Sequence, residues 1–326
     1  MNYGLPYQGS KNRIARRLIE ALPAAPVLYD VFCGGCAVTH AAMLSGKYQR
    51  FVINDRRGWL PDAFREAING GYAHEGRWIS REDFKQLKDT DAYAALCFSF
   101  GNDCRTYMYA RGLEPYKRAL HCAIFWRDFT PWRELCPETA DALASGLAPI
   151  EDRKQRRIQA GKFIVGSLRA QIAAGTLTPD ILDKPIYRQI RRSKGAMTTV
   201  ETLQSLESLE RLERFERLER LQSLPGALTV HSGDYRELCF DEPGIIYCDP
   251  PYKDTADKSK DYADTSFDAE AFYSWCEAQK LPIYISEYQM PEERFVCVAE
   301  WDKVTRMAAK TTTHATERLW RPRTQL

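Results

Sequence analysis

The sequence predicts an α/β protein built on a Rossmann-like sheet, and three segments carry this prediction. Residues 27–32 form an apolar, β-favouring run, which a glycine turn at residues 33–36 and a helical pattern at 38–44 follow. Residues 50–55 and 244–248 form two more such runs, and an aspartate stands at or just after the end of each. A buried strand, a glycine turn and a helix open a nucleotide-binding βαβ unit. We therefore expect a ligand site at the carboxyl ends of these strands.

The composition is that of a soluble globular protein with room for one large domain or two. Of the 326 residues, 44% are hydrophobic and 28% are charged, with a formal net charge of +2. The sequence has no run of 18 apolar residues, so we expect no membrane span. The ten cysteines are scattered and no secretion signal is recognised, which predicts reduced thiols in a cytoplasmic protein. Cys33 and Cys36 form the only Cys-x-x-Cys pair, and no second pair completes a metal site.

The run at residues 244–248 stops at Asp249-Pro250-Pro251-Tyr252, which brings several useful groups together. Asp249 offers a carboxylate acceptor at the carboxyl end of a strand. Pro250 and Pro251 fix φ and lack N–H groups, so the carbonyl of Pro250 is held in a rigid turn and can accept a hydrogen bond. Tyr252 offers a flat ring for stacking. Together these groups suit an exocyclic amine on a planar base, and the alternative is an ordinary turn at a strand end.

Asp249-Pro250-Pro251-Tyr252 resembles the catalytic motif of DNA adenine-N6 methyltransferases, and the whole chain resembles the Dam-type branch that is common in phages. The resemblance implies a methyltransferase sheet with helices on both faces. It implies methyl transfer from S-adenosylmethionine to N6 of a flipped adenine in double-stranded DNA, with all four motif residues catalytic. It also implies that the protein is located in the cytoplasm of a bacterial or phage-infected bacterial cell. The favoured oligomeric state is a monomer.

The N-terminal segment carries a second part of the resemblance. Residues 9–11, Gly-Ser-Lys, precede a helical pattern at 14–22, which we expect to end before Pro23. Such a turn presents backbone N–H groups and a cation, a suitable seat for a carboxylate. By resemblance, Lys11 holds the carboxylate of S-adenosylmethionine and Tyr7 packs on the cofactor.

The glycine turn resembles the methyltransferase motif Asp/Glu-x-Phe-x-Gly-x-Gly, which assigns Asp30, Phe32 and Gly34 to the cofactor. The chain departs from the motif at its last position, where Cys36 replaces glycine. Asp55 lies about 20 residues past the turn, where Rossmann-type folds place the carboxylate that binds ribose hydroxyls. The alternative for Asp55 is a cap for the following helix.

Residues 228–235 form a further strand pattern that ends in Asp234-Tyr235. By resemblance this pair flanks the adenine of the cofactor, where Asp234 accepts from the amine and Tyr235 stacks. Asp249 also contacts the cofactor in this interpretation. The alternative is a turn formed by Gly233 and Asp234.

The motif order predicts a catalytic, S-adenosylmethionine-binding domain at residues 1–57 and 201–326, interrupted by a mainly helical target-recognition insertion at 58–200. Residues 151–195 contain eleven Lys or Arg and four acids, a local balance of +7 that suits a polyanion. A solvated charged face is the alternative. Five insertion residues are our candidates for DNA contact: Arg105, Tyr107, Tyr109, Lys117 and Arg118. The tyrosines are equally compatible with a helical core.

Five other segments complete the prediction. Residues 202–224 repeat an apolar residue every third position, with four Glu–Arg i,i+4 pairs, which predicts a helix. The polar residues 253–264 are a candidate lid over the extruded base. Residues 282–288, 295–298 and 317–320 are expected to be strands that complete the sheet, and the stretches 286–288 and 316–320 resemble phage members of the family.

Rival functions remain open at this point. A second enzyme interpretation is methylation of cytosine N4, an RNA base or a glutamine amide. A protein of a different class is also possible: a DNA-binding protein that retains a catalytically dead methyltransferase fold. The apparently complete set of Lys11, Asp55 and Asp249 argues against it.

Overall fold

The computed structural model describes residues 3–72, 74–191, 221, 226–251, 267–307 and 311–326. Two compact units divide the chain: unit 1 comprises residues 1–73 and 217–326, and unit 2 comprises residues 74–216. The helical repeat expected at 202–224, apart from Leu221, and the candidate lid at 253–264 lie outside the described residues.

Unit 1 is built on a seven-stranded sheet in the order β3-β2-β1-β4-β5-β7-β6. Its strands are β1 (Val27–Asp30), β2 (Arg50–Asp55), β3 (Ala227–Ser232), β4 (Gly244–Cys248), β5 (Ile283–Glu287), β6 (Phe295–Met307) and β7 (Thr311–Pro322). The five strands from β3 to β5 are parallel, whereas β7 runs antiparallel to both β5 and β6. The expected α/β fold and the position of each predicted strand are confirmed.

The middle of the sheet is where the strand order reverses. From β1 the chain continues to β2 on one side, while β4 pairs with β1 on the other, with Asp30 opposite Tyr247. All residues of β1 are buried, as are Ile245 to Cys248 of β4, which explains the continuous apolar runs in the sequence. Open α/β sheets bind ligands at such a reversal, outside the carboxyl ends of the strands. The fold therefore directs attention to the segments that follow β1 and β4.

Unit 1 also contains several helical segments, two of which contact the sheet directly. They are η1 (Lys11–Arg13), α1 (Ala15–Ala21), α2 (Ala37–Ser45), α3 (Trp59–Ile68), η7 (Tyr235–Glu237), α13 (Ala269–Glu277) and η8 (Arg323–Gln325). As expected, α1 ends before Pro23, and its C-cap is Leu22. The helix α2 contacts β1 and β2, and α3 contacts β2 and β3. The expected boundary at residue 57 thus differs from that of unit 1, because α3 packs on the sheet.

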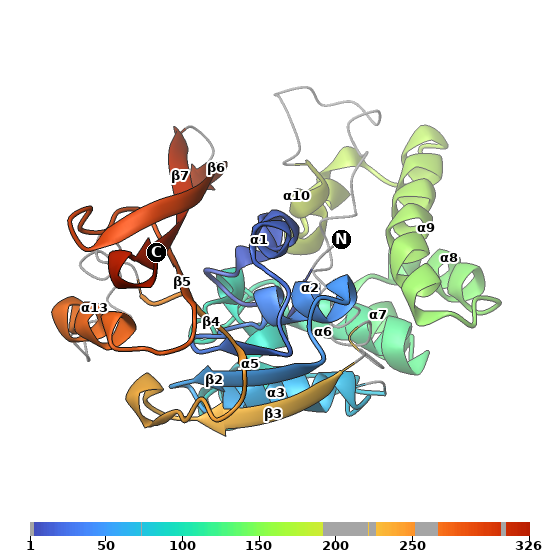
Figure 1. Ribbon diagram of the computed structural model, residues 1–326. Helices are drawn as coiled ribbons and strands as arrows, with labels where there is room; N and C mark the ends of the chain where they lie inside the picture. The colour runs from blue at the N-terminus through green and yellow to red at the C-terminus, as the bar shows by residue number, and fades with distance from the viewer. Residues whose placement is uncertain (1–2, 73, 192–220, 222–225, 252–266, 308–310) are drawn as a thin grey trace. The chain divides into compact units, whose positions relative to one another are not determined.

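The last two strands form a long hairpin, which Figure 1 shows in red beside β5. β7 pairs with β5 only between Ile285↔Trp320 and Glu287↔Arg318. The hairpin itself continues past this point, with Trp301 opposite Glu317 and Met307 opposite Thr311. The hairpin therefore extends beyond the carboxyl end of β5, and Glu317 lies where it leaves β5.

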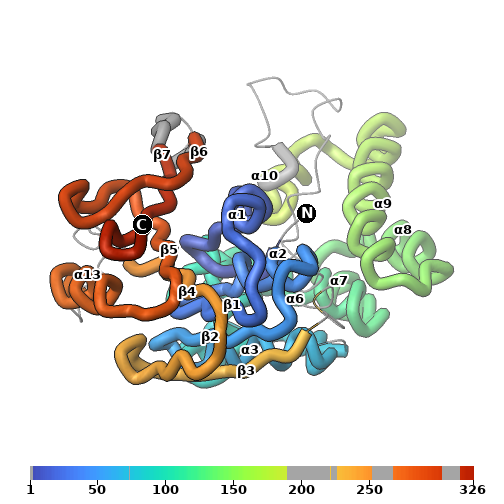
Figure 2. The backbone as a smooth tube through the Cα atoms, viewed as in Figure 1, coloured from blue at the N-terminus to red at the C-terminus, as the bar shows by residue number. Residues whose placement is uncertain are grey.

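The described part of unit 2 consists of helices and their connections. They are α4 (Arg81–Leu87), α5 (Ala92–Phe98), η2 (Phe100–Asn102), α6 (Glu114–His121), η3 (Cys122–Trp126), α7 (Thr130–Leu135), α8 (Pro137–Leu147), α9 (Arg153–Ala173), η4 (Pro179–Asp183) and α10 (Pro185–Arg191). Several begin at a side chain that caps the helix: Ser80 and Asp83 form a capping box for α4, and Asp152 caps the 21-residue α9. Figure 2 traces this succession of helices in cyan to yellow-green.

No helix within the described ranges combines the length and the apolar character that crossing a bilayer requires.

Candidate active site

The turn between β1 and α2 depends on small residues with a left-handed backbone. Gly34 has φ +47°, and Cys36, the N-cap of α2, has φ 55° and ψ 34°. A non-glycine residue in this region carries a strain of roughly 1–2 kcal/mol. This explains why the related motif has glycine where this chain has Cys36, and it shows that the turn forms despite the substitution.

Tyr7 lies directly over this turn. A Cβ atom added to Gly35 would come within 2.7 Å of Cβ of Tyr7, and one added to Gly34 would come within 3.4 Å of its ring. The Tyr7 hydroxyl accepts a hydrogen bond of 3.2 Å from Arg57. Gly35 is therefore needed for Tyr7 to approach the backbone of the turn, whereas Gly34 is needed for its positive φ.

Two carboxylates approach the same turn from the ends of β1 and β2. Asp55 accepts hydrogen bonds of 2.9 Å from the N–H groups of both Gly34 and Arg57, and its burial raises its pKa despite these bonds. Asp30 is 1% exposed, and its Oδ2 accepts a 2.6 Å hydrogen bond from Thr39. Burial raises the pKa of Asp30 to about 7, against the Thr39 hydrogen bond, and the carboxylates of Asp249 and Asp55 add to the rise.

Asp249, immediately after β4, pairs with the residue that was expected to hold the cofactor carboxylate. Lys11 Nζ donates a 2.6 Å hydrogen bond to Asp249 Oδ1 and lies 3.4 Å from Oε1 of Glu317. The exposed fractions of these side chains are 5% for Lys11, 19% for Asp249 and 0% for Glu317. Burial alone would lower the pKa of Lys11, but the two carboxylates outweigh it and raise this pKa. Pro250 is buried and Pro251 half-buried, whereas Tyr252 lies outside the described residues.

A further carboxyl group lies at the end of β5, and our sequence prediction gave it no role. Glu287 is 7% exposed, and its Oε1 accepts a 2.7 Å hydrogen bond from the N–H of Tyr288. Burial raises the pKa of Glu287 to about 8, the N–H of Tyr288 opposes the rise, and Asp249 adds to it. The pairing of β4 with β5 brings Glu287 to the same edge of the sheet as Asp249.

Asp234 and Tyr235 lie just beyond β3. Asp234 caps η7 and pairs with the guanidinium of Arg236 at 2.7 Å, and this hydrogen bond lowers the pKa of Asp234 to about 2. The ring of Tyr235 lies 5.3 Å from that of Phe32 and packs edge-on against Phe272. The structure thus brings Phe32 and Tyr235 together, while Asp234 is engaged by its neighbour Arg236.

The candidate DNA-contacting residues of unit 2 separate into a buried group and a more exposed group. Tyr107 is 8% exposed and donates a 2.9 Å hydrogen bond to the carbonyl of Ile79, and Lys117 is 6% exposed. Tyr109 stacks on Trp78 at 5.5 Å, and Arg105 is half-buried. Arg118 is exposed. The burial of Tyr107 and Lys117 favours a scaffold role for both, because each side chain is largely enclosed by protein.

One surface residue of unit 2 was missed by the sequence prediction. Phe100 is the first residue of η2, shortly after α5, and is 55% exposed, unlike the buried Phe98 two positions earlier. The segment that follows it contains three residues with positive φ, between 58° and 64°: Gly101, Asn102 and Cys104. Strain of this kind gathers at functional sites. The residue types alone gave no sign of which phenylalanine would face outward.

The basic stretch at 151–195 is only partly a surface feature. Arg156 is buried and donates hydrogen bonds to the carbonyls of Ile124, Ile150 and Glu151. Lys184 pairs with Glu138 at 2.8 Å. Lys154 and Lys162, by contrast, are exposed on α9. The local balance of +7 therefore overstates the charge that is available to a polyanion.

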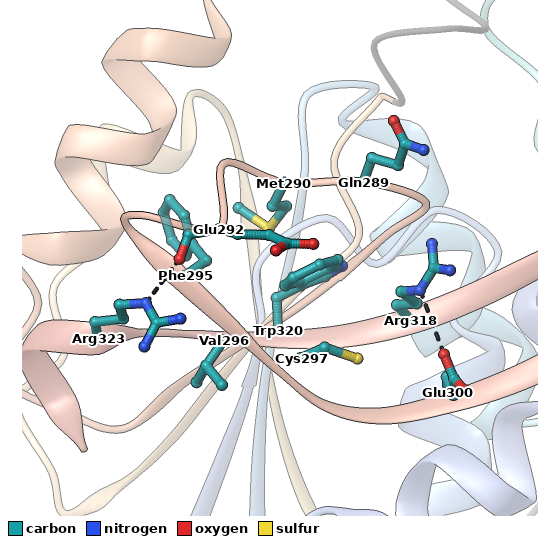
Figure 3. A pocket seen from close by; sticks show the side chains of 10 residues that line it. All are labelled: Gln289, Met290, Glu292, Phe295, Val296, Cys297, Glu300, Arg318, Trp320 and Arg323. Carbon is teal, nitrogen blue, oxygen red and sulfur yellow. Dashed lines mark hydrogen bonds and ion pairs between the residues drawn. The ribbon is translucent and has the colours of Figure 1, made fainter.

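A groove of about 550 Å³ lies along the β6–β7 hairpin (Figure 3), lined by Gln289, Met290, Glu292, Phe295, Val296, Cys297, Glu300, Arg318, Trp320 and Arg323. Of its charged groups, Arg318 lies 3.4 Å from the Glu300 carboxylate and Arg323 donates to the backbone carbonyl of Glu292. None of its lining residues belongs to the group of Lys11, Asp249 and Glu317. We assign no function to this groove.

The strand order, the glycine turn after β1 and the Asp-Pro-Pro segment after β4 together fit an α/β methyltransferase fold. Residues 7–118 match the family model of the D12 class N6 adenine-specific DNA methyltransferases, and this match supports an adenine-specific DNA methyltransferase. The match includes Tyr7, Lys11, Gly34 and Asp55. No curated protein matches the chain. The predicted class, enzyme type and site-specific adenine methylation are thereby confirmed.

Proposed function

We propose that the enzyme takes its methyl group from S-adenosylmethionine and transfers it to an adenine that is turned out of double-stranded DNA. The register of β1 and β4 is the main support. Asp30 lies opposite Tyr247, and the N–H of Val31 donates to the carbonyl of Tyr247 at 3.0 Å. Asp249 follows two residues later, so the segments after β1 and β4 leave the same edge of the sheet side by side.

The residues around the glycine turn fit the proposed cofactor. Oδ1 of Asp30 is buried and has no hydrogen-bond partner among the described residues, which suits an ammonium group. Asp55 is positioned to accept from ribose hydroxyls, and Tyr7 offers a ring beside the turn. When bound, S-adenosylmethionine supplies an electrophilic methyl group on a sulfonium centre. Lys11 can bind the carboxylate of S-adenosylmethionine only if its ammonium also keeps, or gives up, its contact with Asp249.

The residues after β4 supply the orientation that methyl transfer requires. The carboxylate of Asp249 and the carbonyl of Pro250 would each accept one N6 hydrogen of the adenine, which turns the nitrogen lone pair toward the methyl carbon. As nitrogen becomes positive, the carboxylate stabilises the developing charge. Proton removal before attack is not needed: the bond between methyl carbon and sulfur would break as the bond to N6 forms, and N6 would lose its extra proton afterwards to the Asp249 carboxylate. We assign stacking on the adenine to Tyr252, which completes the motif.

The DNA side of the reaction falls to unit 2 in this proposal. Turning a base out of the duplex costs a few kcal/mol, which contacts to DNA must offset. Arg118 is exposed for a phosphate, and Arg105 and Tyr109 lie in the same segment as Phe100. We propose that Phe100 fills the gap in the base stack. Tyr107 and Lys117 support this segment from within.

Incubation of the purified protein with unmethylated double-stranded DNA and isotopically labelled S-adenosylmethionine tests the proposal. We expect mass spectrometry of the digested DNA to show labelled N6-methyladenine. Asp249→Ala should abolish the product while calorimetry still detects cofactor binding. Methylcytosine without methyladenine, or an active and folded Asp249→Ala variant, would contradict the proposal. No cofactor binding by the wild-type protein would instead support a catalytically dead fold.

A further inference from the structure

Glu317 is a fully buried acid in the strand that leaves the edge of β5. Its exposed fraction is 0%, and the neighbouring Leu319 and Trp320 are also buried. Glutamate is almost never fully buried unless it is paired, because removal of a carboxylate from water is strongly unfavourable. Its Oε1 lies 3.4 Å from Lys11 Nζ, so the pairing exists. Neither the motif pattern nor the family match, which ends at residue 118, gives Glu317 a role.

Lys11 connects Glu317 to the catalytic carboxylate. Its ammonium lies between Glu317 Oε1 at 3.4 Å and Asp249 Oδ1 at 2.6 Å. The three residues come from η1, from the segment after β4 and from β7, and all belong to unit 1. The result is a buried row of acid, cation and acid that joins three distant parts of the chain.

The physical role of the second acid follows from the nature of lysine. A lysine ammonium is a point charge on a flexible four-carbon stem, so one partner alone leaves it free to follow that partner. A second carboxylate, which is fully buried, restrains the ammonium further. Asp249 is 19% exposed and follows the end of its strand, so it is the member of the row with more freedom to move.

The backbone around Glu317 is well anchored. Arg318 donates a 2.6 Å hydrogen bond to the carbonyl of Tyr288, and Trp320 Nε1 donates a 3.0 Å hydrogen bond to the carbonyl of Glu287. Both bonds fasten β7 to the end of β5, immediately after Glu317. A carboxylate on such a segment is a suitable fixed point for Lys11.

We propose that Glu317 is a positioning residue for methyl transfer: its carboxylate fixes the ammonium of Lys11, and Lys11 fixes Oδ1 of Asp249 where the adenine amine must bind. This inference depends on the proposed role of Asp249. Because Lys11 here keeps its contact with Asp249 and does not turn to the cofactor carboxylate, Glu317 is important for the rate of the chemical step and unimportant for the capture of the cofactor. A shift of about 1 Å in a catalytic group can lower a rate by roughly 10²-fold.

Glu317→Gln tests the proposal because it keeps the shape and removes the charge. We expect the single-turnover rate of adenine methylation to fall by roughly 10- to 100-fold, while the Kd for S-adenosylmethionine changes by less than about twofold. Glu300→Gln is the matched control, since Glu300 lies in the same hairpin and is 64% exposed. It should methylate at the wild-type rate. Circular dichroism and Tm verify that each variant is folded.

A double-mutant cycle with Lys11→Met separates positioning from a merely structural role. If Glu317 acts through Lys11, Glu317→Gln lowers the rate in the wild-type background and has no further effect in the Lys11→Met background. In that background it should also raise Tm, because it removes a buried charge that has lost Lys11. Should Glu317→Gln not fold, Glu317→Asp keeps the charge one methylene further back, and the same cycle applies with a smaller loss of rate.

Two outcomes overturn the inference. One is a wild-type methylation rate in folded Glu317→Gln or, if that variant does not fold, in Glu317→Asp. The other is that Glu317→Gln lowers the methylation rate by the same factor in the wild-type and in the Lys11→Met background. A wild-type protein that makes no methyladenine would instead refute the proposed function.

Discussion

The N–H of Gly34 donates a 2.9 Å hydrogen bond to Oδ2 of Asp55, so the end of β2 is tied to the turn that follows β1. The carboxylate thus has two functions: it shapes the turn and, in our proposal, it binds the ribose of the cofactor. Its other oxygen accepts from the N–H of Arg57.

We therefore predict that Asp55→Asn weakens both folding and cofactor binding. An amide can accept only through its single oxygen, so one of the two N–H groups loses its partner. We expect a loss of about 1–3 kcal/mol in the free energy of unfolding, and a cofactor Kd at least tenfold higher. Urea denaturation and calorimetry measure the two effects. Asp62→Asn, at an exposed position of α3, is the control, and equal effects in both variants would contradict the prediction.

A second prediction concerns the close approach of Tyr7 to the turn. Gly35→Ala places a Cβ 2.7 Å from Cβ of Tyr7 and 3.1 Å from the carbonyl of Leu5, so Tyr7 must move. We expect weaker cofactor binding by calorimetry and a lower Tm. Gly166→Ala, in the interior of α9 with nothing within 4 Å, should instead raise stability by about 0.5–1 kcal/mol. A Gly35→Ala protein with unchanged Kd would show that Tyr7 does not contribute to cofactor binding.

The raised pKa of Glu287 predicts a pH dependence of stability. Its ordinary pKa of 4.5 rises to about 8 in the folded protein, so the folded state holds the proton more tightly than the unfolded state. The contribution of Glu287 is fully present below pH 4.5 and is lost as pH rises through about 8. The loss amounts to a few kcal/mol at most.

Glu287→Gln checks this relationship, because glutamine stays neutral throughout. We expect the difference in unfolding free energy between wild type and Glu287→Gln to shift in favour of the variant between pH 5 and pH 9. Urea titrations across this range measure it. A difference that stays constant with pH would mean that the carboxyl group does not titrate in this window.

A fourth prediction concerns the exposed ring of Phe100. Loss of an aromatic ring that stacks on bases typically costs about 1–3 kcal/mol per base. We expect Phe100→Ala to weaken DNA binding and to reduce the fluorescence increase of a 2-aminopurine at the target position. Trp126→Ala, at another exposed aromatic residue of unit 2, is the control.

A target base that is already mismatched provides the complementary measurement. It is easier to turn out, so it should restore much of the methylation that Phe100→Ala loses on paired DNA. If Phe100→Ala and Trp126→Ala behave alike on both substrates, Phe100 has no special role in opening the duplex.

Much of unit 1 could be predicted because its signals are local. The apolar runs of β1, β2 and β4 each end near a glycine turn, an acid or two prolines, and in the sheet β1 pairs with both β2 and β4. The contact between Lys11 and Glu317 could not be predicted in this way. It depends on the antiparallel register of β7 against β5, which no short pattern in the sequence specifies.

In unit 2 it was harder to predict which side chains lie at the surface and are accessible to DNA. Tyr107 and Lys117 occur in a segment rich in aromatic and basic residues, yet both are buried. Arg156 likewise adds to the local positive charge in the sequence while donating to three backbone carbonyls. Charge counts and residue types do not distinguish such side chains from those at the surface, and Phe100 shows the same difficulty in reverse.

The pairing of β1 with β4 has a consequence for how the chain matures. Val27 must pair with Gly244, and all of unit 2 is encoded between them. During synthesis, therefore, the ribosome releases the helices of unit 2 while the central strand of unit 1 still lacks its neighbour on one side. Truncated chains that stop before β4 would expose the apolar edge of β1, and unit 1 can close only after the last third of the protein has emerged.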